Sequence, residues 1–89
     1  MARGGGTPVS RTKTGITTTA VALGTSEFCR SLGLQADPDN TADILLGDVD
    51  NQHMQLAAGA SLSIEVADPS TLFVKSVSGT QVANFIMVI

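Results

Sequence analysis

The seven residues SLSIEVA, Ser61 to Ala67, decide how this 89-residue chain is expected to fold. Apolar and polar side chains alternate along it without a break. Leu62, Ile64 and Val66 fall on one face, while the intervening serines and the glutamate fall on the other. A period of two is that of a strand with one face in the core and the other in solvent. The stretch therefore predicts a half-buried antiparallel strand.

Six further segments are short, rich in apolar or β-branched residues, and separated by turn residues. They are ITTTAVAL (16–23), FCRSLGLQA (28–36), ADILLG (42–47), HMQLAAG (53–59), LFVKSV (72–77) and VANFIMVI (82–89). The breaks between them contain Asp, Asn, Ser, Pro and Gly, which favour turns. Strands separated by turns at this spacing indicate an all-β protein. We expect a small antiparallel β-sandwich or barrel, jelly-roll-like, with about seven strands and an extended N-terminal arm.

Alternation within FCRSLGLQA predicts which of its side chains face the core. The inward series is Phe28, Arg30, Leu32, Leu34 and Ala36, and the outward series is Cys29, Ser31, Gly33 and Gln35. An arginine in the inward series is expected to find a carboxylate, with Asp43 or Asp48 as the candidates, or to lie at the rim. The last segment, 82–89, is apolar to its end. It is expected to be buried on both faces or covered by another chain.

A helix across 37–58 is the alternative to two turns and two strands in that region. The segment contains helix-forming residues and a candidate N-cap, but Gly47 and the scattered Asp and Asn residues disfavour a long helix.

Residues 1–14 differ from the rest of the chain in composition and charge. They carry Arg3, Arg11 and Lys13 without any acid, whereas the remainder has two basic and eight acidic residues. This stretch is rich in Gly, Thr and Ser and shows no hydrophobic period, so we expect an extended basic arm at 1–14 and a single domain at 15–89. The three basic side chains are the candidate contacts to a partner protein. Nucleic acid is a less expected partner, because the domain is acidic and almost free of aromatic residues.

Composition narrows the class of protein further. The sequence is 43% hydrophobic and 15% charged, and its net charge is −3. It has no run of about 18 apolar residues and no apolar stretch behind its first arginine, so neither a membrane span nor a secretory signal is expected. A single cysteine, Cys29, cannot form an internal disulfide and is expected to be a small packed residue.

The aspartates and the one histidine, His53, are the residues that could carry chemistry. The acids around Asp37 and Asp48 do not have the spacing of a calcium loop, which needs further ligands and a glycine at fixed positions. Catalysis would need a nucleophile, a base and an orienting acid, and no G-x-S-x-G motif or phosphate loop occurs. We expect turn-forming acids, a surface or subunit-contact histidine, no cofactor, no metal and no enzymatic activity.

Three stretches of the chain resemble small virion proteins of tailed bacteriophages. They are TTTAVALGTSEFCRSLGLQADPDNTADILLGD (17–48), HMQLAAGASLSIEV (53–66) and LFVKSVSGTQVANFIMVI (72–89). The matching positions are Gln35, Ala36, Asp37, Pro38, Asn40, Gly47, Asp48, Leu56, Gly59, Val74, Lys75 and Gly79. Gly47 and Gly79 are expected where a tight turn needs a positive φ.

This resemblance implies a structural subunit with a small β-sandwich fold. It implies a capsid decoration or cement protein, or a head-fibre component, on the surface of the virion. The implied partners are the major capsid protein and further copies of the chain, arranged as a trimer. The alternatives are a tail, fibre-base or head-to-tail component, and a host-surface carbohydrate-adhesion module.

Overall fold

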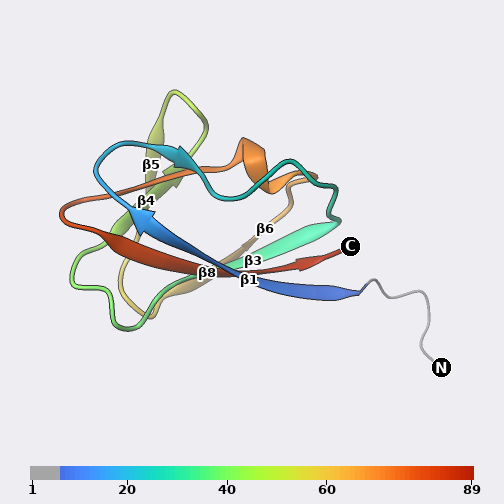
Figure 1. Ribbon diagram of the computed structural model, residues 1–89, viewed down its shortest axis with the longest axis horizontal. Coiled ribbons are helices and arrows are strands. Elements are labelled where there is room, and N and C mark those ends of the chain that lie inside the picture. The colour runs from blue at the N-terminus through green and yellow to red at the C-terminus, as the bar shows by residue number, and fades with distance from the viewer. Residues whose placement is uncertain (1–6) are drawn as a thin grey trace.

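The computed structural model describes residues 7–89, which form eight β-strands and one short 3₁₀ helix (Figure 1). Sheet A contains, in spatial order, β1 (Pro8–Ile16), β8 (Gln81–Val88), β3 (Ser31–Ala36) and β6 (Ser61–Ile64). Sheet B contains β2 (Val21–Ala22), β7 (Phe73–Ser76), β4 (Ile44–Gly47) and β5 (Gln52–Leu56). The helix η1 (Pro69–Thr71) precedes β7.

The strands are connected as a jelly roll. The first strand pairs with the last, the second with the seventh, the third with the sixth and the fourth with the fifth, all antiparallel. This is one long hairpin folded over on itself. Additional pairing of β3 with β8 and of β4 with β7 joins the four pairs into two sheets, a connectivity found in two-sheet jelly rolls. The predicted small antiparallel sandwich is confirmed, with eight strands in place of about seven.

One hydrophobic core fills the space between the sheets. Its central part comes from β3 and β8, where Leu34 stands opposite Phe85 and Leu32 opposite Met87. Directly opposite residues point to the same face of a sheet, so these pairs face sheet B together. The core residues are Ile16, Leu23, Cys29, Leu32, Leu34, Ala36, Ile44, Leu46, Leu56, Leu72, Val74, Ala83, Phe85 and Met87. The predicted inward positions of Leu32, Leu34 and Ala36 are confirmed.

The boundary expected between an arm and a domain moves toward the N-terminus. Residues 8–14 belong to β1, which pairs with β8 from Pro8↔Val88 to Ile16↔Gln81. The backbone groups of Thr7 and Ile89 also bond to each other, at 2.9 and 3.0 Å. Pairing with β8 of the same chain therefore makes residues 8–14 a strand, although these residues have no apolar period. Arg3 lies outside the described residues.

Every predicted strand except the last is shorter than expected, and SLSIEVA is a strand only over Ser61–Ile64. The segment 16–23 does not form one strand: Ile16 closes β1, only Val21 and Ala22 form β2, and the chain bends between them as it passes from sheet A to sheet B. The segment 28–36 becomes a strand only at Ser31. Alternation therefore does not extend to Phe28, which is 69% exposed, or to Cys29, which is 1% exposed. The predicted faces of these two residues were wrong.

Region 37–58 contains β4, β5 and turns, and the helical alternative is wrong. The final strand, β8, is central in sheet A, and one of its faces is buried. Its other face is open enough to leave Ile86 46% exposed, so this chain by itself does not bury the strand on both faces.

Candidate interaction surfaces

The side chains that could carry chemistry do not converge in the part of the chain that the structure describes. Between residues 7 and 89, no group of three or more His, Cys, Asp or Glu side chains could hold a metal ion. His53 is exposed on the edge strand β5. Over the same residues, no helix is long and apolar enough to cross a membrane. Three surfaces of the sandwich are candidate sites.

The aspartates act as turn formers, as predicted. The Asp37 carboxylate accepts the N–H of Asp39 at 2.9 Å, and the Asp48 carboxylate accepts those of Asp50 and Asn51 at 2.9 and 2.7 Å. The pKa of Asp37 is lowered mainly by the hydrogen bond from the Asp39 N–H, and further by the bond from the Asn84 side chain. These bonds mimic backbone turns.

Arg30 does not pair with either expected carboxylate. Asp43 instead accepts a hydrogen bond from the Gln55 amide, and the Asp48 carboxylate accepts backbone N–H groups of its own turn. The one ion pair among the described residues joins Arg11 Nη2 to Glu27 Oε1 at 3.2 Å. Arg30 lies exposed just before β3, at the rim of the sandwich.

The first surface, the β1–β2 side, is where the edges of β1 and β2 lie beside each other. Arg11 stands opposite Phe85 and Lys13 opposite Ala83, and both partners face the core. These two cationic side chains thus occupy positions of β1 that face the gap between the sheets. With Val21, they border a depression of about 440 Å³. The structure therefore brings together two of the three predicted contact residues.

β1 also carries other features that hinder pairing with a further strand. Pro8 stands near its start, and the register shifts between Lys13 and Ile16, where Gly15 has a φ of +68°. Prolines, bulges and inward-pointing charges are the devices by which edge strands avoid pairing with other chains. The β1–β2 side is therefore a charged surface and a poor template for strand addition.

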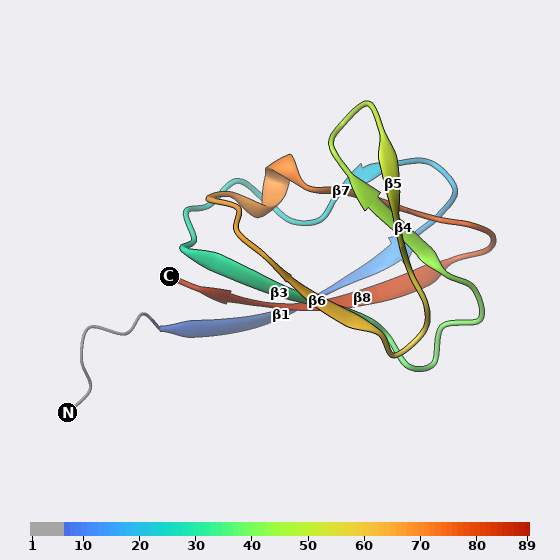
Figure 2. The same ribbon diagram turned by 180° about the vertical axis from the view of Figure 1, so that it is seen from behind.

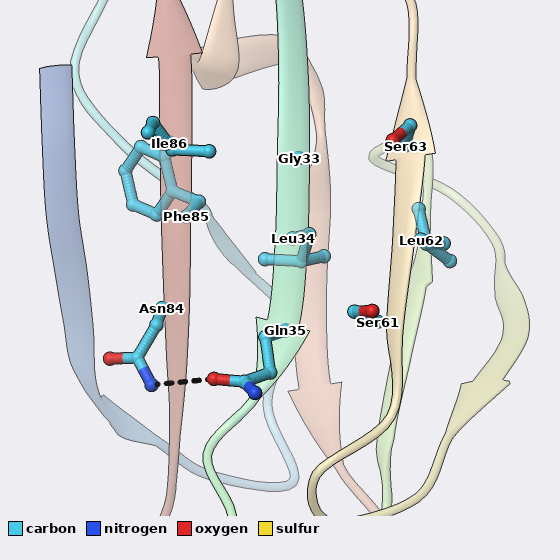
Figure 3. A pocket seen from close by; sticks show the side chains of 9 residues that line it. All are labelled: Gly33, Leu34, Gln35, Ser61, Leu62, Ser63, Asn84, Phe85 and Ile86. Carbon is cyan, nitrogen blue, oxygen red and sulfur yellow. Dashed lines mark hydrogen bonds between the residues drawn. The ribbon is translucent and has the colours of Figure 1, made fainter. Parts of the chain in front are cut away.

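The second surface is the outer face of sheet A (Figure 3). Gly33 forms the floor of a shallow groove of about 500 Å³ between β8 and β6, and Ile86, Ser61 and Ser63 border it. A Cβ on Gly33 would lie 3.3 Å from Cγ2 of Ile86, so the glycine leaves room for that side chain. The groove is shallow, and its lining combines two serines and two side-chain amides with the apolar Ile86.

A row of polar side chains crosses this face at one end of the groove. The Thr12 hydroxyl donates to Asn84 Oδ1 at 3.0 Å, and Asn84 Nδ2 donates to Gln35 Oε1 at 3.4 Å and to Asp37 Oδ2 at 3.1 Å. Asn84 thus ties together strands β1, β8 and β3. The adjacent aromatic ring, Phe85, is 4% exposed and faces the core. The groove does not present a ring on which a sugar could stack.

The third surface, the β5–β6 side, lies opposite the β1–β2 side and is apolar. The outer strand of sheet A and the outer strand of sheet B leave between them a slot of about 290 Å³. Its lining is Leu46, Gly47, Met54, Leu62, Ser63, Ile64 and Leu72. Met54 is 60% exposed, and Leu62 and Ile64 are half-buried. The alternation of SLSIEVA predicted which way Leu62 and Ile64 point, but not that their strand would be an edge.

Cys29 is the buried thiol of the molecule. Its Sγ donates to the carbonyl oxygen of Val66 at 3.1 Å, and its side chain belongs to the core. Burial raises the pKa of this thiol, and the carboxylates of Asp68 and Glu27 raise it further. The prediction of a small packed residue is confirmed.

No protein-family model matches the chain, and no curated protein matches its sequence with significance. Solved structures with the same fold include two proteins. One is protein NMB1881 from Neisseria meningitidis, with a TM-score of 0.60 and 11% identity, covering 100% of this chain and 79% of that one. The other comes from Bacillus endospore appendages, described as a family of disulfide-linked pili, with a TM-score of 0.60 and 19% identity, covering 98% and 89%. At these identities the likeness concerns the fold alone.

Proposed function

We propose that this chain is a non-enzymatic structural protein of a bacteriophage virion, and that it decorates the outer surface of the head. In this role it binds the major capsid protein as a cement protein and reinforces contacts between capsid subunits. Further copies of the chain are its second partner. The proposal requires no cofactor and no metal, and it involves neither a membrane nor nucleic acid.

The observation that carries the proposal is the amount of apolar surface that this small jelly roll leaves open. Six large apolar side chains are between 44% and 69% exposed: Phe28, Val49, Met54, Val77, Ile86 and Ile89. Scattered exposed apolar residues are ordinary, but here some of them border defined surfaces, Ile86 at the groove and Met54 at the slot. Such surfaces suit a subunit that gains stability by binding a larger one.

Fold and sequence support the same class of function by analogy. Jelly rolls are common in viral capsid proteins, although a fold alone does not determine function. The sequence resemblance to small virion proteins of tailed phages is the reason that we place the chain on the phage head. One of the structures of similar fold is described as coming from Bacillus endospore appendages that form pili, which also fits a structural role.

The β1–β2 side is the surface that we assign to the capsid. Arg11 and Lys13 lie together there, and Arg3 precedes them in sequence. Cationic side chains at the rim of an interface accelerate association and set its orientation. We expect them to face acidic patches between major capsid subunits.

The surfaces of the sandwich favour the alternatives to a head decoration protein unequally. A tail, fibre-base or head-to-tail component would use the same kinds of surface. Carbohydrate adhesion is less favoured, because the groove on sheet A offers no aromatic ring. A disulfide-linked filament is also less favoured, since the one cysteine of the sequence is buried.

Co-sedimentation with purified heads that lack this protein tests the proposal. We expect saturable binding by the wild type and weaker binding by the double variant Arg11→Gln/Lys13→Gln. The matched control is Arg30→Gln/Lys75→Gln, which removes the same charge elsewhere and should bind like the wild type. Loss of the exposed Arg11–Glu27 pair should cost at most about 1 kcal/mol of stability. Absence of saturable binding by the wild type would contradict the proposal.

Deleting residues 1–14 is not a clean test of the arm, because it removes most of β1 and exposes the edge of β8. Deleting residues 1–6 leaves β1 in place. If Arg3 contributes to attachment, this deletion weakens binding to heads without changing the thermal unfolding of the protein.

A further inference from the structure

The outer edge of β6 is open in the single chain. β6 pairs with β3 on one side and ends sheet A on the other. The Ala36 N–H donates to the Ala60 carbonyl at 3.0 Å, in register with the pair Gln35↔Ser61. Bonded and non-bonded pairs alternate along an antiparallel ladder, so Leu62 and Ile64 direct their backbone groups to β3. Those of Ser61 and Ser63 point to the open edge, and Glu65 follows at the next alternate position, just after β6.

The two edges of sheet A differ in how they are protected. β1 carries Pro8, a register shift and two inward-facing cations. β6 carries no proline, charge or bulge over Ser61–Ile64. An unprotected edge is a template for pairing with another strand. In Figure 2, β6 lies at the near side of the molecule, and the hairpin between β4 and β5 rises away from it.

A partner bound at this edge would also cover the apolar slot on the β5–β6 side. Leu62 and Ile64 point into the slot, and Leu46, Met54 and Leu72 form its other walls. A strand added beside β6 would place its own inward side chains over the opening. The occupant therefore needs apolar side chains at alternate positions and free backbone groups on the matching edge.

We propose that this occupant is β6 of a second copy, so that two chains pair antiparallel about a two-fold axis at Ser63. In this register Ser63 faces Ser63 of the second copy, Leu62 faces its Ile64, and Ser61 faces its Glu65. The residues whose backbone groups point to the open edge then bond to each other, and the apolar side chains of both copies lie on the face of the sheet that covers the core. The two sheets A become one continuous sheet.

Charge and symmetry favour this occupant. Glu65 meets a serine and not its own copy, so no like charges stand directly opposite each other. Two identical edges paired antiparallel form an isologous contact, which closes as a dimer. The trimer implied by the sequence resemblance would require two different surfaces. This inference deepens the part of the proposed function that concerns copies of the chain, and it stands whether or not the chain binds capsids.

Sedimentation equilibrium of the purified protein without capsids tests the dimer. We expect the mass to rise with concentration from the chain mass of 9.1 kDa to twice that value and no further. Ser63→Lys places two like charges on the axis and should leave a folded monomer. Ser63→Pro is a second such variant, because the N–H it removes points to the open edge. The control Thr18→Lys lies in an exposed bend and should still dimerise.

A cysteine pair tests the register. Ser63→Cys should form an intermolecular disulfide under mild oxidation, since directly paired residues in a ladder have Cα atoms about 5.5 Å apart. Ser61→Cys should not, because its copy would lie roughly four residues, about 13 Å, further along the strand. The wild type controls for Cys29. A monomer at all concentrations, a trimer, or a dimer that survives both Ser63 variants would overturn the inference.

Discussion

Gly47 lies so close to Asn51 that a Cβ atom on the glycine would be 1.9 Å from the Asn51 carbonyl oxygen and 2.7 Å from Cα of Gln52. From the sequence, we expected Gly47 to lie in a tight turn that requires a positive φ. Positive φ occurs at Gly15, Gly59 and Gly79, which confirms the prediction for Gly79 but not for Gly47. At Gly47 the reason is steric: the hairpin from β4 to β5 closes onto the glycine itself.

Gly47→Ala is therefore expected to destabilise the fold strongly. The nearest atoms are backbone, so the hairpin must open to accept a methyl group, at a cost of at least about 2 kcal/mol. Gly33→Ala is the matched control, because its Cβ would meet only the end of the Ile86 side chain, at 3.3 Å. Urea unfolding of both variants checks this. Equal loss of stability in the two variants would contradict the steric account.

Asp68 should make stability depend on acid pH. Its carboxylate accepts bonds from the N–H and hydroxyl of Ser70, the hydroxyl of Ser26 and the N–H of Glu27, which tie η1 to the chain before β3. The bonds from Ser70 are the main reason that its pKa falls from 3.8 to about 2. The folded pKa is lower than the unfolded one, so the stabilisation is complete above pH 3.8 and is lost as the pH falls to about 2.

The variant Asp68→Asn tests this link. Its unfolding midpoint should lie below that of the wild type at pH 6, and the difference should shrink as the pH falls toward 2. Asp50→Asn is the charge-matched control, because that side chain forms none of the hydrogen bonds described above, and its effect should be small at both pH values. An undiminished difference at pH 2 would show that the charge of Asp68 does not matter.

Gln81 should contribute more to stability than its polar nature suggests. It is 2% exposed, accepts the N–H of Thr41 at 3.0 Å, and donates to the Ser78 carbonyl at 2.9 Å. Gln81→Leu removes both bonds of a buried amide, although Thr41 and Ser78 are themselves exposed, and the lost hydrogen bonds should cost roughly 0.5–1.5 kcal/mol each. Gln55→Leu removes an exposed amide bonded to Asp43 and serves as the control. Chemical unfolding should rank Gln81→Leu well below Gln55→Leu.

Cys29 should be unreactive in the native protein. The buried thiol, bonded to Val66 and with a raised pKa, should react with a disulfide reagent only as fast as the protein unfolds. A second cysteine introduced as Thr18→Cys, in an exposed bend, should react at once and give an internal reference. Reductant should not change the mass of the wild type. Rapid reaction of Cys29, or a dimer dissolved by reductant, would contradict its placement in the core.

The sequence was sufficient to predict the fold class, since the alternation in SLSIEVA and the core faces of Leu32, Leu34 and Ala36 depend on local periodicity. Three features depend on distant parts of the chain and could not be predicted. β1 is held by β8, the last strand, although its own sequence has no apolar period. Phe28 and Cys29 precede the point where strand geometry begins. Whether Leu62 and Ile64 lie at the centre or the edge of a sheet depends on the topology alone.

The candidate surfaces were predictable from the sequence only where they depend on charge. The basic residues Arg11 and Lys13 were predicted as contacts from their charge, and the structure brings them to one side of the sandwich. The apolar slot was not predicted, because its walls come from β4, β5, β6 and Leu72 between η1 and β7, which meet only in the folded chain.

The most direct test of the central claim, that this protein cements phage heads, is the temperature at which filled heads release their DNA, measured with increasing amounts of the protein. The account predicts that this temperature rises with occupancy and becomes constant at saturation, and that the Arg11→Gln/Lys13→Gln variant needs a higher concentration to reach the same value. A release temperature that stays unchanged at full occupancy would contradict the claim.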